Sequence, residues 1–473
     1  MLGRNLSILA CLLTLTGCMH APAPKTTPYV ITDYGAVGDS NTVNTKAIQS
    51  AIDRCATSGG GVVVVPKGVF MTGALFFKQG VNLRVEQDGV VKGTTNPADY
   101  PAIYTRWEGI ERYWTAALVN FVGMTNVVVS GGGTIDGSGE AFGGGGRGPR
   151  GGGPTQAPSA RADSTPAETA PSPALPKPST AHLSFGPKSG PMPATNAAGV
   201  SVPGRGLGRP RTLVFQSCRN AKVSGLHFKN EASWCVVFIY SEDGLAENLN
   251  IRAVHTIPSS DGIDIDSCSR IRVTGCDIDC NDDCISLKSG KDEDGLRVNR
   301  PCENIIIEKT RFAYGHGGAA MGSETSGGIR NVEVNDCVAE AGNFAPIRFK
   351  SQPSRSGVVE NITYRNMALH DTRQAFEFNL EWRMVPPIAP PAKVLPVVRN
   401  VKMINISGTV NSAGAIHGLP GSPIRGLTFE NCNLTAQRGL MLENVTNIDS
   451  AGLHLKVQSG EPITIRTTGG GRQ

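Results

Sequence analysis

The stretch Asn304-Ile305-Ile306-Ile307 decides the fold, because its pattern returns 27 residues later as Asn331-Val332-Glu333-Val334 and, after 30 more, as Asn361-Ile362-Thr363-Tyr364. Anchors of the same kind, with Asn or a substitute in first place before alternating aliphatic residues, stand at Asn126, Asn220, Asn248, Arg270, Asn304, Asn331, Asn361, Asn400 and Gly426. From the second anchor onward, the spacings run from 22 to 39 residues. Periods in this range predict stacked supersecondary units.

The repeat unit carries strand signals without helical ones, so the natural unit is one coil of a parallel β-helix. A repeated Asn at one corner indicates a turn with left-handed backbone or a ladder of side chains. The 58 glycines and 31 prolines exclude a coiled coil, a helical bundle and a polytopic membrane protein. Asn44 opens one early helical pattern, which Gly59 to Gly61 end and which predicts a cap on the solenoid; its apolar face consists of Ala47, Ile48, Ala51, Ile52 and Cys55.

The N-terminal residues 1–17 are typical of a signal peptide, with Arg4 before a short apolar run. Leu15-Thr16-Gly17-Cys18 resembles the bacterial lipoprotein cleavage box, which predicts acylation of Cys18 and a tether over residues 18–28. The protein is then expected in the bacterial cell envelope, held to a membrane by its lipid. An ordinary secretory signal with an incidental Cys is the alternative.

Residues 143–210 interrupt the repeats between the coils expected over 29–142 and those expected over 211–469. The segment holds 13 of the 31 prolines and 14 glycines, which predicts a disordered insertion. It also holds seven Arg and Lys against Asp163 and Glu168, a net charge of +5. Because the whole chain is +5, the remainder is 5 − 5 = 0, and a nucleic-acid-binding body is not supported.

Ten cysteines remain when Cys11 and Cys18 are set aside. Four of them crowd together without a zinc-like spacing or nearby histidines: Cys268, Cys276, Cys280 and Cys284. Disulfides suit an exported protein, whereas free thiols stacked inside the solenoid suit this placement. Both alternatives stay open.

Four short motifs follow one another at coil spacing. Asp261 and Asp282 are 21 residues apart, and one coil of a parallel β-helix is one strand step of about 4.8 Å. Gly315-His316-Gly317 and Arg348-Phe349-Lys350 follow on later coils, with a long loop expected over Lys288 to Cys302. The pattern therefore places Asp261, Asp282, Asp283, His316, Arg348 and Lys350 in one groove. Carboxylates beside cationic groups suit acid–base chemistry on an anionic substrate.

These motifs, as Ser259-Ser260-Asp261-Gly262, Asp282-Asp283, Gly315-His316-Gly317 and Arg348-Phe349-Lys350, resemble those of glycoside hydrolase family 28, the polygalacturonases and their relatives. The resemblance implies an all-β, single-stranded right-handed parallel β-helix, a pectin lyase-like solenoid with an N-terminal capping helix. It also implies inverting hydrolysis of α-linked galacturonate chains such as the acidic plant cell-wall polysaccharides, without a cofactor or metal. We expect a monomer.

The same resemblance assigns roles to residues. Asp282 is the expected general acid, Asp261 and Asp283 activate water, and His316 orients or tunes the acid. Arg348 and Lys350 are expected to bind the sugar carboxylate. An inverting enzyme needs acid and base carboxyls about 6.5–9.5 Å apart.

Two tryptophans bear on the groove. Trp107 is assigned here to substrate binding, and Trp382 is the second aromatic residue expected near the groove. The stretch Arg106 to Gly109 resembles exo-acting bacterial members, whose loops block one end of the cleft, so an exo-acting enzyme is expected. For both indoles, packing inside the protein is the alternative to stacking on a sugar. Ser259-Ser260 stands where polygalacturonases have Asn-Thr, which leaves the exact uronide open.

Two other functions remain. A polysaccharide lyase on the same solenoid would use an Arg or Lys base. A non-catalytic, carbohydrate-binding surface β-helix would need only the repeat, and it leaves the four motifs unexplained.

Overall fold

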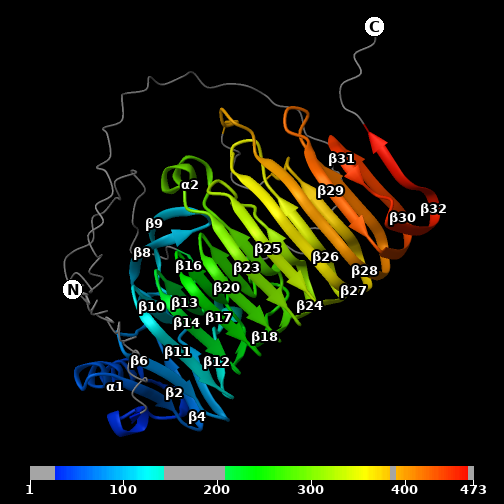
Figure 1. Cartoon of the computed structure of the whole chain (residues 1–473). Helices are drawn as coiled ribbons and strands as arrows, with labels where there is room; N and C mark the ends of the chain where they lie inside the picture. Colours follow the sequence, from blue (N-terminus) through cyan, green and yellow to red (C-terminus); the bar gives the residue numbers. More distant parts are fainter. Residues whose placement is uncertain (1–26, 143–207, 384–389, 467–473) are drawn as a thin grey trace, which may run out of the picture.

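A computed structural model describes residues 27–142, 208–383 and 390–466. In these ranges the chain forms a parallel β-helix, in which each strand pairs with the equivalent strand of the next coil, from the blue N-terminal coils to the red C-terminal end (Figure 1). Each full coil has three faces, called A, B and C here, and the chain runs through them in the order B, C, A. The parallel β-helix predicted from the repeats is confirmed.

The strands divide among the faces as follows. Face A contains β5 (Leu75–Phe76), β10 (Val119–Val122), β13 (Leu213–Gln216), β16 (Val236–Ile239), β19 (Ile263–Asp266), β22 (Asp283–Lys288) and the C-terminal parts of β24 (Arg311–Met321), β26 (Val338–Lys350), β27 (Val358–Asn379), β28 (Val397–His417), β30 (Cys432–Glu443) and β32 (Leu453–Arg466). Face B contains β1 (Pro28–Val30), β3 (Gly61–Val65), β6 (Val81–Val85), β11 (Thr125–Gly131), β14 (Arg219–Ser224), β17 (Glu242–Glu247), β20 (Ser269–Thr274), β23 (Cys302–Glu308), β25 (Ile329–Asn335), the first parts of β27 and β28, β29 (Ile424–Glu430) and β31 (Val445–Asp449). Face C contains β2 (Asp39–Val43), β4 (Gly68–Thr72), β7 (Gly89–Gly93), β12 (Thr134–Asp136), β15 (His227–Lys229), β18 (Asn250–Arg252), β21 (Asp277–Asp279) and the remaining parts of the long strands. Outside the coils, β8 (Ala102–Trp107) and β9 (Ile110–Thr115) form an antiparallel hairpin.

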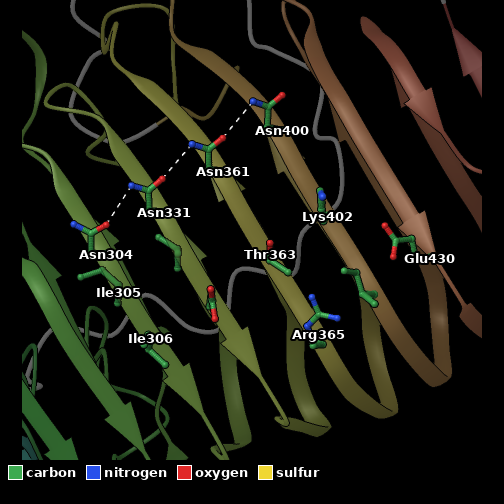
Figure 2. Close-up of a pocket in the computed structure, with 13 residues that line it drawn as sticks. Asn304, Ile305, Ile306, Asn331, Asn361, Thr363, Arg365, Asn400, Lys402 and Glu430 are labelled. Atoms are coloured by element: carbon green, nitrogen blue, oxygen red, sulfur yellow. Dashed lines mark hydrogen bonds between the residues drawn. The ribbon is translucent and has the colours of Figure 1, made fainter.

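The anchor residues of the repeat form the corner before face B. All nine have a positive φ, between +53° and +57° for the eight that are not glycine, where Asn is tolerated better than most residues. Their side-chain amides form a ladder: Asn331 donates to Asn304 at 3.2 Å, Asn361 to Asn331 at 3.1 Å and Asn400 to Asn361 at 3.2 Å (Figure 2). The corner therefore uses both devices that the sequence predicted, and each link holds two coils in register.

The interior is a column of stacked apolar side chains. Equivalent phenylalanines on face A lie over one another, with ring centroids 5.4 Å apart for Phe121 and Phe215 and 5.0 Å apart for Phe215 and Phe238. All ten cysteines of the described ranges are buried and free. The alternative of inward-stacked thiols is therefore the one that the structure shows.

Two helices flank the coils. α1 (Thr45–Thr57) covers the first coils with Ile48, Ala51, Ile52 and Cys55, which confirms the predicted cap (Figure 1). α2 (Asp292–Val298) occupies part of the segment expected to be only a long loop, Lys288 to Cys302. In the described ranges, no helix is both long enough and apolar enough to span a membrane.

Several expectations fall on residues that the structure does not describe. The signal peptide, Cys18 and nearly all of the tether precede residue 27, and most of the insertion lies between residues 142 and 208. Lipidation of Cys18 and disorder of the insertion therefore stay predictions. The last residues of the expected insertion, 208–210, are described, and the Gly208 carbonyl accepts a hydrogen bond from the Thr115 hydroxyl at 2.9 Å.

One buried carboxyl group lacks a hydrogen-bond partner among the described residues. Glu231, in the corner between β15 and β16, is 0% exposed, and neither carboxyl oxygen has a hydrogen-bond partner among the described residues. Burial raises its pKa from 4.5 to about 8. The group therefore folds in its protonated form, and this contribution to stability falls as the pH rises from about 4.5 to about 8.

We predict that Glu231→Gln makes the protein more stable than the wild type by roughly 1–3 kcal/mol near pH 8, because the amide needs no proton uptake on folding. Near pH 4 the two proteins should be equally stable, since the wild-type carboxyl is then protonated in both states. Thermal unfolding across this range measures the difference, with Glu461→Gln, an exposed position, as control. Parallel pH profiles for wild type and Glu231→Gln would show that Glu231 is ionised in the folded protein.

Candidate active site

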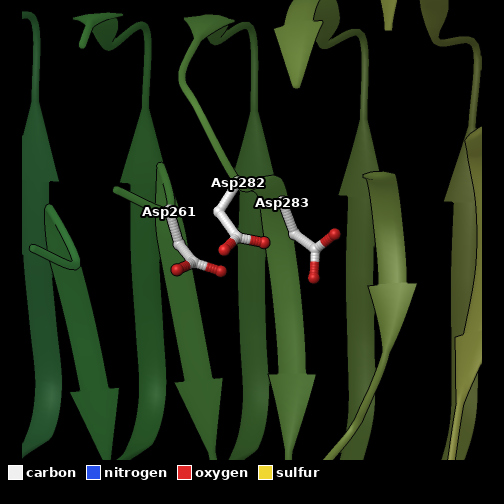
Figure 3. A group of neighbouring side chains, drawn as sticks. All are labelled: Asp261, Asp282 and Asp283. Carbon is white, nitrogen blue, oxygen red and sulfur yellow. The ribbon is translucent and has the colours of Figure 1, made fainter. Parts of the chain in front are cut away.

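Three carboxyl groups meet at the start of two neighbouring strands of face A. Asp261 precedes β19, Asp282 precedes β22 and Asp283 opens β22, and the register pairs Ile263 with Ile285. Oxygens of the three groups lie within 4.8 Å of one another (Figure 3). The expectation that residues one coil apart project side by side is therefore correct for these aspartates.

Asp283 is clamped by two cations. Arg348 donates from Nη1 to Oδ1 at 3.0 Å, and Lys350 donates from Nζ to Oδ2. Asp283 is 0% exposed, and burial alone would raise its pKa, but the charges of Lys350 and Arg348 outweigh burial and lower the pKa. Asp283 is therefore held as a carboxylate. Because calcium sites are built from unpaired oxygen ligands, a carboxylate neutralised in this way suits a metal poorly.

Asp282 pairs with His316 on the solvent side of the cluster. The His316 Nδ1 atom lies 3.5 Å from the Asp282 Oδ1 atom, and the His316 backbone N–H donates to the Asp282 carbonyl at 2.8 Å. Partial burial raises the pKa of Asp282, but the hydrogen bond and charge of His316 outweigh it and lower the pKa. The same hydrogen bond raises the pKa of His316. Asp282 and His316 therefore form an ion pair, in which Asp282 is a carboxylate and the proton is on the imidazole.

Asp261 has the opposite electrostatics. It is 3% exposed, and its pKa is raised well above 3.8, first by burial and then by the charges of Asp264 and Asp282. No cation in the described structure lies on its carboxyl group as Lys350 lies on that of Asp283. Three adjacent carboxyl groups thus have three environments, which is the condition for acid and base roles to separate.

The hairpin β8–β9 covers face A on the side of the cluster toward the N-terminus. It packs on outward-facing apolar residues of β13 and β16, namely Val214, Val237 and Ile239. A buried ion pair fixes it there, because the Arg106 Nη1 atom lies 2.9 Å from Asp266 Oδ1, with 0% and 1% of the two side chains exposed. At the hairpin tip, the Lys291 N–H donates to the Gly109 carbonyl at 2.9 Å.

Trp107 lies inside this packing. It is 7% exposed, and its ring centroid is 4.6 Å from that of Trp114 and 4.6 Å from that of Trp234. Its ring is therefore covered by two other indoles, and we correct the sequence-based expectation that Trp107 stacks on a sugar. The stretch Arg106 to Gly109 nevertheless borders the site, because it belongs to the hairpin that covers one end of face A, as its resemblance to exo-acting members implied.

Trp382, in contrast, stands at the opposite end of the cluster. Its half-exposed ring centroid is 4.9 Å from Arg348 Cζ and 5.5 Å from Lys350 Nζ. The sequence placed this residue near the groove without assigning it a function. The site also contains Glu377, which accepts from Arg348 Nε and is not part of any motif.

A buried network of charged side chains lies between the hairpin and the aspartates. No sequence motif predicted that these side chains would meet. The Lys288 Nζ atom is 3.5 Å from Asp264 Oδ1 and 3.4 Å from Glu324 Oε2, and it lies 4.7 Å from the Trp234 ring centroid. Burial raises the pKa of Glu324, but Lys288 and Arg355 outweigh it and lower the pKa to about 2. Because these residues come from separate coils and loops, no local pattern could have grouped them.

Comparison with known proteins agrees with this geometry. The profile of glycosyl hydrolases family 28 matches residues 201–459, and that of rhamnogalacturonase A/epimerase, pectate lyase-like, matches residues 30–129. A probable polygalacturonase of Vitis vinifera is 26% identical over 415 residues, which are 85% of this chain and 73% of that protein. An exo-poly-alpha-D-galacturonosidase of Dickeya chrysanthemi is 30% identical over 353 residues, 72% of this chain and 54% of that protein.

Solved structures share the fold. A hyperthermoactive exopolygalacturonase from Thermotoga maritima is 27% identical with a TM-score of 0.68, over 91% of this chain and 94% of that chain. The family 28 exopolygalacturonase of Yersinia enterocolitica has a TM-score of 0.73 at 21% identity, over 94% of this chain and 77% of that chain. The family profile spans more than half of the present sequence, including all three aspartates. The chain is therefore a glycosidase and belongs to glycosyl hydrolases family 28.

Proposed function

We propose that the protein is an exo-acting, inverting hydrolase of α-linked galacturonate chains. The observation that carries this proposal is the cluster Asp261, Asp282 and Asp283, whose carboxyl groups have different electrostatics and lie between a covered end and a cationic end of face A. The relatives named as polygalacturonases and exo-acting galacturonosidases support the substrate class and the mode of attack.

We assign the general acid to Asp282. Its side chain is 29% exposed and shares a proton with His316, so it can meet a glycosidic oxygen. In the free protein that proton resides on the imidazole. A substrate chain entering beside this pair excludes water, which disfavours both charged groups and moves the proton from the imidazole onto Asp282. General-acid catalysis of this kind contributes about 10²–10⁴-fold to the rate.

Asp261 and Asp283 are assigned to the attacking water, with the ionised Asp283 as its hydrogen-bond acceptor and Asp261, whose pKa is raised, as the group that orients it. Both oxygens of Asp283 already hold cations, so this carboxylate is a poor nucleophile toward a sugar carbon but can accept a hydrogen bond from water. A covalent glycosyl intermediate on it is therefore disfavoured, which argues for inversion. The spacing does not supply this argument, since oxygens of the cluster come within 4.8 Å whereas inverting carboxyls are commonly about 6.5–9.5 Å apart.

The covered end of face A supports the exo mode. The hairpin occupies the outer surface of β13 and β16, and Trp234, next to Asp261 in the register, is 3% exposed. A polymer passing over the aspartates would collide with this wall. Only a chain end fits between the wall and the cluster, and the rest of the chain leaves past Arg348 and Trp382.

The lyase alternative is disfavoured by the same ion pairs. A lyase of this fold would need a neutral Arg or Lys as base. Arg348 has its pKa raised further, because the charges of Asp283 and Glu377 outweigh the effect of burial, and Lys350 is bonded to Asp283. Arg348 therefore stays protonated, and Lys350 is occupied by its hydrogen bond to Asp283. A purely carbohydrate-binding role leaves the three differently tuned carboxyl groups without a purpose.

The direct test of the proposed function is product analysis on polygalacturonate. We expect monogalacturonate as the only early product, a slow fall in viscosity and no absorbance from unsaturated sugars. A ladder of oligomers would contradict the exo mode, and unsaturated ends would indicate a lyase.

We predict that Asp282→Asn lowers kcat by about 10²–10⁴-fold without unfolding the protein, because an amide cannot donate the proton. Initial rates on digalacturonate and thermal unfolding measure the two effects. Asn433→Ala, at an exposed position on face C further along the solenoid, is the control. Near-wild-type turnover by Asp282→Asn would remove this residue from the acid role.

We predict that Lys350→Met shifts the acidic limb of the kcat/KM profile to higher pH. Lys350 lowers the pKa of Asp283, so its removal raises that pKa, and a higher pH is then needed to keep the carboxylate ionised. Lys402→Met, an exposed residue on face B, is the matched control. If Lys350 only bound substrate, KM would rise while the limb stayed in place.

A further inference from the structure

A row of side chains leads away from Asp282 along the edge of face A. The register pairs Asp283 with Gly317 and Gly317 with Ala345, so the preceding residues Asp282, His316 and Phe344 stand on successive coils. Ile347 pairs with Phe376, which continues the row to Arg373. Each coil adds about 4.8 Å, close to the length of one sugar unit in a linear chain. The Arg373 backbone stands three coils beyond Asp282, but its guanidinium lies against the ring of Phe344, two coils beyond Asp282. This guanidinium is thus level with the second unit on the departing side of the scissile bond.

Arg373 can bind a substrate carboxylate more readily than the two cations of the cluster can. Arg348 and Lys350 have only 6% and 8% of their side chains exposed, and both are bonded to Asp283. Arg373 is exposed, and no carboxylate of the described residues lies within ion-pair distance of it. Arginine presents a planar fork of donors that matches a carboxylate.

Phe344 holds Arg373 in place. The Arg373 Cζ atom is 5.0 Å from the Phe344 ring centroid, and the Arg348 Cζ atom is 5.7 Å from the same centroid. A cation held against an aromatic ring keeps its orientation at a small entropic cost. The ring therefore fixes an unpaired guanidinium one coil beyond the paired one.

We propose that Arg373 binds the carboxylate of the second uronate unit on the leaving-group side, with Phe344 as its positioning residue. The proposal rests on the proposed function, since it places the scissile bond at Asp282. Beyond Arg373 the edge carries Asn411 and Gln437, whose side chains are hydrogen-bonded to each other at 3.4 Å. These neutral amides hold no charge for a further uronate unit. Arg373 itself favours a trimer, which reaches it, over a dimer, which does not.

The test compares Arg373→Gln with the wild type on digalacturonate and trigalacturonate. KM for the trimer should rise about fivefold, the size expected for one exposed ion pair, while KM for the dimer stays unchanged. Arg373→Lys should recover part of the loss. Raising the salt concentration should shrink the difference between wild type and Arg373→Gln, because the contact is exposed. Arg365→Gln, an exposed arginine on face B, is the matched control and should change neither constant.

Binding to Asp282→Asn, measured by calorimetry, separates this inference from the proposed function. Tighter binding of trimer than dimer, lost in Asp282→Asn/Arg373→Gln, supports the site even if turnover follows another route. Equal losses on dimer and trimer, or no loss on the trimer, would overturn the assignment of Arg373. Absence of turnover by the wild type on either oligomer would instead contradict the proposed function.

Discussion

The hydrogen-bonded step between parallel strands, about 4.8 Å per coil, is the constraint on which the rest of this molecule depends. It turns sequence separations of 21 to 39 residues into a fixed short distance, so that Asp261 and Asp282, 21 residues apart, become neighbours. The left-handed corners at Asn304, Asn331 and Asn361 keep that step in register, because a slip would break the amide ladder and turn buried side chains outward. Catalytic geometry is thus a product of backbone pairing.

Buried charges of opposite sign lie close together on face A and beside it. Face A buries Asp264, Asp266, Asp283 and Glu324 along a few coils, together with Arg106, Lys288, Arg348 and Lys350. Burial of an isolated charge is costly, and the cations offset part of that cost. Asp283 and Glu324 keep lowered pKa values, whereas burial outweighs the cations at Asp264 and Asp266 and raises the pKa of both. Asp261 is the group left without such a clamp, and its raised pKa follows from that position. The same cations that tune the aspartates make the departing side attractive to an acidic sugar chain.

The sequence was sufficient for whatever depends on the repeat. The anchors, the capping helix and the grouping of the three aspartates with His316 and Arg348 all follow from periodicity plus one strand step per coil. The wall formed by the hairpin β8–β9 was expected only from the resemblance of Arg106 to Gly109 to exo-acting members, because its place depends on the pairing of Arg106 with Asp266, 160 residues away. For the same reason, the burial of Trp107 under Trp114 and Trp234 left no trace in the local pattern. The two ion pairs of Asp283 could not be predicted either, since the motif identifies the cations but not the carboxylate that they contact.

The central claim is that water, directed by Asp261 and Asp283, displaces a leaving group protonated by Asp282 in one step. The anomeric configuration of the first released sugar tests it most directly, by proton NMR during the initial turnovers of trigalacturonate. A single displacement at an α-linkage predicts that the β-anomer of galacturonate appears first and then equilibrates. Initial release of the α-anomer would show retention through a covalent intermediate and would contradict the account.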